Sequence, residues 1–139
     1  MARRDFYTET GKQVDRYSDF HHSFIPSPGN GQIGKKVNVD AVKMAVRNLV
    51  LTDKYERPGN PSIGCNVRGS LFDLMDGGSE AEIEGWIRDV IDRFEPRVDI
   101  EEINVNANHD GNEVRIDLLF SVKTIPEIQN LELKLIRDR

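Results

Sequence analysis

Phe94-Glu95-Pro96-Arg97-Val98 marks the change from helix to strand that decides the fold of this chain. Proline lacks the N–H that a helix interior needs, and it pushes the residue before it toward extended geometry. We therefore expect Glu95 and Arg97 to flank a fixed corner. A carboxylate at a helix C-terminus costs about 0.3–1 kcal/mol unless a cation compensates it. The corner thus favours a specific paired contact; the alternative is a surface helix end with a solvated ion pair.

The residues before this corner predict a helix that begins near Ser79 and ends at the proline. Ser79 and Glu82 stand three positions apart, as the two members of a capping box do. An apolar stripe follows at helical spacing and indicates one buried face. It consists of Ile83, Trp86, Ile87, Val90, Ile91 and Phe94.

The residues after the corner predict three antiparallel strands. The first runs over about 97–106, and its alternation slips at Glu101-Glu102, which indicates a bulge. Asp110-Gly111 predicts a hairpin turn, and a cleanly alternating strand follows over 114–123. After a turn at 124–127, alternation over 131–135 predicts a last strand.

That last strand carries Leu131, Leu133 and Leu135 and is expected at an edge of the sheet. Unpaired backbone groups at an edge can template a further strand. The three leucines are therefore candidate partner-binding residues.

Upstream of these elements, two more helices and one long loop are expected. Asn38 or Asp40 opens a helix that runs to about Leu51, with its valines and Leu49 on one face. A loop with two prolines and two glycines spans 52–64. A short helix follows Asn66, and its apolar residues are Leu71, Phe72, Leu74 and Met75.

This order of elements predicts an α+β fold, in which three helices pack on one face of a small antiparallel sheet containing a C-terminal hairpin. Residues 1–36 are poorly periodic and are expected to form an N-terminal arm and loop. Residues 37–139 are expected to form the single domain.

Composition excludes several classes of function. The chain has 139 residues and a formal net charge of −5, which disfavours non-specific binding to nucleic acid. No apolar run is long enough to span a bilayer, and the N-terminus lacks the apolar segment of a signal peptide. Cys65 is the single cysteine, so synthesis in the cytoplasm with a reduced thiol is expected.

No constellation of residues predicts catalysis, a metal site or a cofactor. His21 and His22 are sequence neighbours without further ligands, and Cys65 lacks an adjacent base. Acidic residues are abundant, but glycoside hydrolysis needs two carboxyl groups at a defined separation across a sugar cleft. The features that remain belong to an interaction protein: an aromatic arm, a long loop, a charged corner and an edge strand.

Several stretches occur together in the order of a known family. They are residues 17–20, 39–43, 49–64, 71–72 and 94–98. With them the chain resembles, over roughly residues 17 to 137, the small baseplate wedge protein of contractile-tailed bacteriophages. That family includes the matching baseplate subunit of type VI secretion systems.

The resemblance implies a structural role in the virion, in the tail baseplate around the tube, with assembly in the host cytoplasm. It implies that the corner of Glu95, Pro96 and Arg97 contacts the core bundle of the larger wedge proteins. It also implies that the C-terminal sheet starts polymerisation of the tail sheath. The expected partners are these proteins, with no nucleic acid, membrane or small-molecule substrate. Some members carry a tail-lysozyme label, so a peptidoglycan-degrading enzyme is one alternative and a free adaptor is another.

Overall fold

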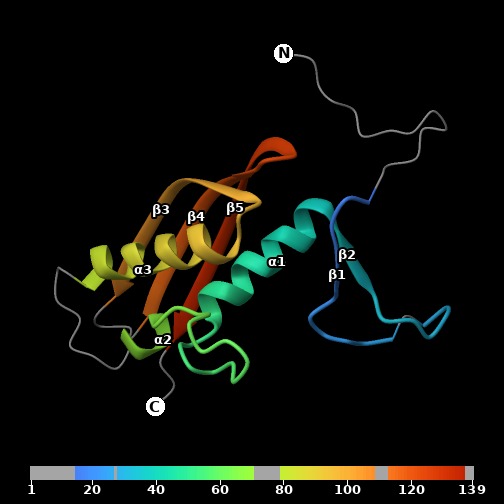
Figure 1. The fold of residues 1–139 in the computed structure, drawn as a ribbon, viewed down its shortest axis with the longest axis horizontal. Coiled ribbons are helices and arrows are strands. Elements are labelled where there is room, and N and C mark those ends of the chain that lie inside the picture. The colour runs from blue at the N-terminus through green and yellow to red at the C-terminus, as the bar shows by residue number, and fades with distance from the viewer. Residues whose placement is uncertain (1–14, 27, 71–78, 109–112, 137–139) are drawn as a thin grey trace. The chain divides into compact units, whose positions relative to one another are not determined.

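The computed structural model describes residues 15–26, 28–70, 79–108 and 113–136 (Figure 1). The chain divides into two compact units, Met1–Ala41 and Val42–Arg139. The boundary expected at residue 36 stays a prediction.

The first unit contains a small two-stranded sheet that the sequence pattern did not predict. β1 (Ser18–Phe20) pairs antiparallel with β2 (Lys35–Val37). Asn38, which follows β2, binds the residues that precede β1: its N–H donates to Tyr17 O at 2.8 Å and its Oδ1 accepts from Arg16 N at 2.9 Å. Strands of three residues are too short to show an alternating pattern, so the sequence alone predicts only an arm here.

Two of the three helices have the bounds that their sequences predict. α1 (Asn38–Leu51) is confirmed, and α3 (Ser79–Phe94) ends at the proline corner. Val42, Val46 and Val50, at intervals of four, are at most 1% exposed and form the buried stripe of α1. The third helix, α2 (Val67–Ser70), is one turn long in the described part of the chain. The apolar residues predicted for it, 71–75, lie outside the described residues.

α3 buries one face, as its sequence predicts. Ile83, Ile87 and Ile91 have no exposed surface, and Val90 is 3% exposed. Trp86, which belongs to the same predicted stripe, lies at its margin and is half-buried. The helix packs against the first strand of the large sheet.

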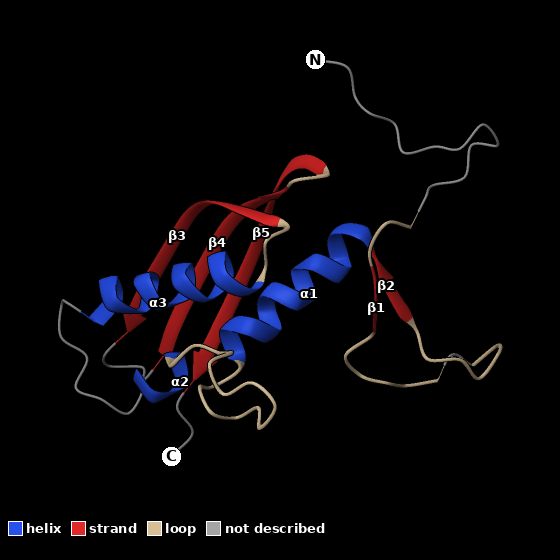
Figure 2. Ribbon diagram, in the orientation of Figure 1, coloured by secondary structure: helices blue, strands red, loops and turns tan. Residues whose placement is uncertain are grey.

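The large sheet is antiparallel and has the order β3-β4-β5 (Figure 2). Its strands are β3 (Val98–Asn108), β4 (Glu113–Val122) and β5 (Ile125–Ile136). The predicted bulge is confirmed, since the β3–β4 register shifts between Ile100 and Glu102. β5 begins earlier than predicted, at Ile125, because the turn before it is only Lys123-Thr124. The hairpin turn predicted at Asp110-Gly111 lies outside the described residues.

The sheet has one apolar and one polar face, which confirms the α+β class. Every second residue of β4 is fully buried: Val114, Ile116, Leu118, Phe120 and Val122. Figure 1 shows α3 and the part of α1 that belongs to the second unit, residues 42–51, on the same side of this sheet. The opposite face carries the polar residues of all three strands and is called the open face below. No helix in the described ranges is both long and apolar enough to cross a membrane.

Candidate assembly interface

The proline corner is held by backbone hydrogen bonds on both sides of Pro96. Glu95 N donates to Ile91 O at 2.8 Å and completes the last turn of α3. Val98 N donates to Glu95 O at 3.2 Å, so the chain folds back at once into β3. Arg97 O accepts from Lys123 N at 2.9 Å, which ties the corner to the end of β4. The corner is therefore a rigid part of the second unit.

The two charged side chains of the corner bind each other. Arg97 Nε donates to Glu95 Oε1 at 2.5 Å and Arg97 Nη2 donates to Glu95 Oε2 at 2.6 Å. The Glu95 side chain is 5% exposed and the Arg97 side chain 36%. Such bidentate pairs fix the guanidinium plane as well as its position. Arg97 is thus the cation that compensates the Glu95 carboxylate at the C-terminus of α3.

This geometry divides the predicted site residues of the corner into two kinds. Glu95 faces inward, and its carboxylate is occupied by Arg97. Pro96 is exposed and the Arg97 side chain is partly exposed. The surface of the corner is therefore made by proline and guanidinium, with Glu95 as the residue that positions the guanidinium.

Two hydrogen bonds establish which backbone groups of the sheet face outward. Hydrogen-bonded and non-hydrogen-bonded pairs alternate along an antiparallel ladder. Lys123 N bonds to Arg97 O, so the next pair, Val98 with Val122, is a non-hydrogen-bonded pair. At the far end of β3, Ala107 N donates to Glu80 Oε1 at 2.8 Å and not to β4. The alternation of hydrogen-bonded and non-hydrogen-bonded pairs assigned at the Val98 end of β3 therefore agrees with the pattern at the Ala107 end.

The same alternation passes through β4 to β5. Val114 lies opposite Ala107, so it directs its N–H and C=O toward Leu135 on β5. By the same parity, every second residue of β5 bonds to β4, and the residues between them direct their backbone groups outward. The outward set is Ile128, Asn130, Glu132, Lys134 and Ile136.

The three predicted leucines belong to the inward set. Leu131, Leu133 and Leu135 pair with core residues of β4, and Leu133 and Leu135 are 3% and 7% exposed. Their side chains stabilise the core. The backbone groups that a partner strand could bind belong to Asn130, Glu132 and Lys134, which sequence reasoning missed. Alternation shows which side chains face the core, but the outward backbone set needs the ladder register as well.

The two edges of the sheet differ. β5 pairs with β4 alone among the described strands, so its outer side is an edge. β3 is the other terminal strand, and Glu80 accepts one of its outward N–H groups. A charged side chain at an edge is a common protection against unwanted strand pairing. β5 has no comparable side-chain cover among the hydrogen bonds of the described residues.

Charges on the open face are partly paired. Glu113 accepts from Arg115 Nε at 2.5 Å and lies 2.9 Å from Lys134 Nζ. Hydrogen bonds from Arg115 and then Lys134 lower the pKa of Glu113, and the bond to Glu113 raises the pKa of Arg115. Asp117 lies directly opposite Glu132, a like-charge pair that is ordinarily destabilising.

Cys65, His21 and His22 are the other side chains whose chemistry could serve catalysis or metal binding. Cys65 is fully buried, and burial raises the pKa of its thiol to about 11, so the nucleophilic thiolate is suppressed. The rings of His21 and His22 lie 4.3 Å apart between centroids. Within the described ranges, no three His, Cys, Asp or Glu side chains gather as metal ligands would.

Comparison with known proteins identifies relatives of this chain. A family profile described as "Baseplate wedge protein gp25" matches residues 37–127. The baseplate wedge protein gp25 of Enterobacteria phage T4 is 26% identical over 107 residues, which covers 76% of this chain and 81% of the phage protein.

Solved structures show the same fold at low sequence identity. A Geobacter sulfurreducens protein provisionally described as a tail lysozyme has a TM-score of 0.62 at 19% identity, covering 70% of this chain and 89% of its own. A chain of the anti-feeding prophage baseplate has a TM-score of 0.60 at 18% identity, covering 88% and 87%. A chain of the type VI secretion baseplate complex has a TM-score of 0.53 at 13% identity, covering 70% and 92%.

Proposed function

The chain belongs to the baseplate wedge protein gp25 family and is a structural protein of a contractile tail baseplate, and from this premise we propose two docking functions. The corner of Pro96 and Arg97, positioned by Glu95, docks on the core bundle of the larger wedge proteins. The outer edge of β5 binds an extended segment of the tail sheath protein and starts sheath growth. The protein acts in the tail baseplate of the virion after assembly in the host cytoplasm.

The corner suits docking because its geometry exists before any partner binds. Glu95 restrains the Arg97 guanidinium through two hydrogen bonds, so binding loses little side-chain entropy. Arg97 uses its Nε and Nη2 donors on Glu95, so it presents a guanidinium of fixed plane and orientation to a partner. An assembly joint needs this kind of directional contact, because it must set the orientation of the next subunit.

The edge of β5 suits a repeating partner because its recognition rests on the main chain. A strand added to an open edge gains affinity from backbone hydrogen bonds. The outward groups of Asn130, Glu132 and Lys134 form a continuous row of this kind. Exposed isoleucines at the two ends of the row, Ile128 and Ile136, supply apolar contacts.

One observation supports the edge proposal above the others: an outward N–H of β3, that of Ala107, is bound by Glu80, whereas no side chain binds an outward group of β5 among the hydrogen bonds of the described residues. Strand addition is then directed to one side, as ordered growth from a template requires. If both edges were equally open, subunits could add in two directions. Glu80 is therefore the residue that we expect to limit strand addition at β3.

The proposal is tested by Glu132→Pro, with Glu132→Ala as the matched control. Proline removes an outward N–H while the bonds from β5 to β4 stay in place, and alanine keeps that N–H. We expect tails with Glu132→Pro to show baseplates and tubes without sheath in electron micrographs, and tails with Glu132→Ala to be sheathed. Fully sheathed tails from both variants would refute the edge function.

We propose that the chain has no peptidoglycan hydrolase activity. Both oxygens of the buried corner carboxylate, Glu95, already accept hydrogen bonds from Arg97, so this carboxylate does not face a sugar cleft as one of a hydrolase pair would. Purified protein should leave a peptidoglycan suspension turbid. Clearing of that suspension would support the lysozyme alternative, and stable binding to a soluble protein unrelated to tails would support the adaptor alternative.

A further inference from the structure

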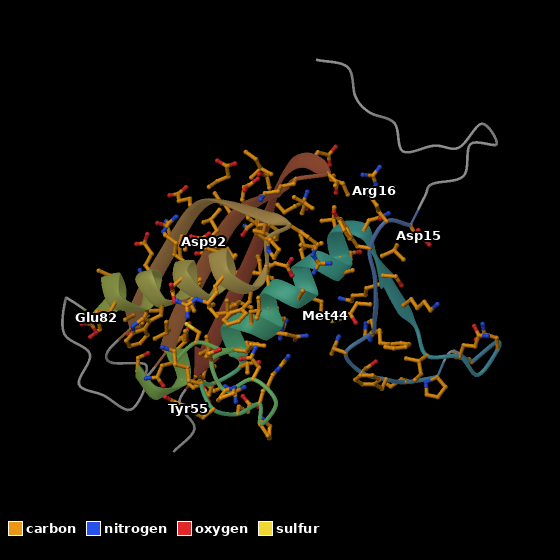
Figure 3. All side chains as sticks on the ribbon, viewed as in Figure 1. Asp15, Arg16, Met44, Tyr55, Glu82 and Asp92 are labelled. Atoms are coloured by element: carbon orange, nitrogen blue, oxygen red, sulfur yellow. The ribbon has the colours of Figure 1, made fainter. Side chains whose placement is uncertain are left out.

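The loop between α1 and α2 is tied together by its own backbone. Tyr55 N donates to Pro61 O at 3.0 Å across the loop, and Cys65 N donates to Thr52 O at 2.7 Å at its base. Glu56 N donates to Asp53 O at 3.2 Å near its start. The loop is therefore a defined surface, and Figure 3 labels Tyr55 on it.

Tyr55 has a backbone conformation that is rare for its residue type. Its φ is +71°, in the left-handed region that non-glycine residues rarely adopt. Its side chain is 81% exposed, so the ring adds almost nothing to the core. Such strained residues cluster at functional sites.

Gly64, in the same loop, is a position where the backbone itself requires glycine. It has a φ of +123°, and a Cβ there would lie 2.5 Å from Thr52 O. Glycine thus occupies the position where the backbone requires it. At Tyr55 the chain keeps an exposed aromatic ring where glycine would be less strained.

The two acids of the loop are held by the loop or buried in part. Asp53 N donates to Glu56 Oε2 at 2.9 Å, which ties the exposed Glu56 carboxylate to the backbone, and Asp53 Oδ1 is buried. Lys54 and Arg57 are exposed, and neither belongs to an ion pair among the salt bridges of the described residues. The loop therefore presents two cations beside an aromatic ring on a chain of net charge −5.

We propose that Lys54, Tyr55 and Arg57 form a second docking surface, which binds an acidic segment of a neighbouring protein in the assembled particle. Tyrosine and arginine are the residues most enriched at the energetic centres of protein interfaces. The two cations select a partner of negative charge, and Tyr55 is the rigid anchor between them. This surface is separate in sequence from the corner and from β5, and it rests on the proposed function only in that the chain must lie in a particle.

Covalent labelling of purified contractile particles tests the surface. Acetylation of Lys54 should fall at least tenfold in the particle relative to the isolated chain, while Lys35 serves as a reference in both. A zero-length carbodiimide should join the Lys54 amine to an aspartate or glutamate of another protein. Equal acetylation of Lys54 in both states, or cross-links confined to this chain, would overturn the proposal. Absence of the chain from the particles would instead refute the baseplate function.

Substitutions at Tyr55 separate docking from folding. Tyr55→Gly relieves the backbone strain, so the isolated chain should melt at a higher temperature while its incorporation into particles falls about tenfold. Tyr55→Phe keeps the ring and should be incorporated as the natural chain is. Normal incorporation of Tyr55→Gly would show that the ring is not an anchor and would overturn the proposal.

Discussion

Arg97 binds both oxygens of the Glu95 carboxylate, at 2.5 and 2.6 Å, on either side of Pro96 in the connection between α3 and β3. The pair lies between the last residue of α3 and the first residue of β3, and it holds the partly exposed guanidinium of the corner in place. Glu95 is therefore a positioning residue, and its effect on assembly passes through Arg97. The contribution of Glu95 to stability and the contribution of Arg97 to docking can therefore be measured in separate experiments.

Glu95→Ala should lower the free energy of unfolding by about 1.5–3 kcal/mol, because it removes two charge-assisted hydrogen bonds at a buried position. Urea unfolding of the purified chain measures the change. Asp92→Ala, on the exposed side of α3, is the control and should cost less than about 0.5 kcal/mol. Equal, small effects from both variants would mean that the pair contributes little to the fold.

Arg97→Lys should fold but dock poorly. Lysine keeps the charge, but its ammonium cannot bind both carboxylate oxygens in one plane. We expect copurification with coexpressed wedge proteins to fall about tenfold, equivalent to about 1.4 kcal/mol of binding free energy. Arg93→Lys is the control, since Arg93 forms an exposed pair with Asp89. Copurification of Arg97→Lys at the natural level would remove the guanidinium from the docking proposal.

Glu80→Ala should open the protected edge of the sheet. It deprives Ala107 N of its acceptor, which costs about 0.5–1.5 kcal/mol of stability. The exposed β3 edge can then meet the β5 edge of another copy. Light scattering should show self-association that increases with concentration, whereas Glu82→Ala on the exposed surface of the same helix should not associate. A strictly monomeric Glu80→Ala chain would show that Glu80 does not guard the edge.

Glu113 should make stability depend on pH in the acid range. Its pKa is lowered from 4.5 in the folded chain by hydrogen bonds from Arg115 and Lys134. The group therefore adds stability above the unfolded pKa, and this contribution is lost as the pH falls through the folded pKa. Glu113→Gln should reduce stability at pH 7 and have a smaller effect below pH 4, measured by thermal unfolding at each pH. An effect of the same size at both pH values would show that the charge of Glu113 is not responsible.

The large elements of the fold could be predicted because their patterns are long. The stripe of α3 extends over its whole length, and the slip at Glu101-Glu102 gave the position of the bulge. β1 and β2 could not be predicted, because three residues are too few to show a period. The early start of β5 could not be predicted, because clean alternation appears only over 131–135 and residues 124–127 have the composition of a turn.

The candidate site was only partly predictable, for a different physical reason. Sequence indicated that Glu95 needs a cation, and proline indicated a rigid corner. Neither indicates that Arg97, two residues away, supplies that cation inside the chain. In the same way, alternation identified Leu133 as a strand residue, but the ladder register assigns the outward backbone groups to Glu132 and Lys134.

Amide hydrogen exchange along β5, resolved to single residues, tests the central claim most directly. Baseplates bearing bare tubes are compared with fully sheathed tails. The account predicts that the amides of Asn130, Glu132 and Lys134 become at least tenfold more protected when the sheath forms, while those of Leu131, Leu133 and Leu135 stay equally protected in both. If the outward amides exchange at the same rate with and without sheath, the edge of β5 does not bind the sheath and the account is contradicted.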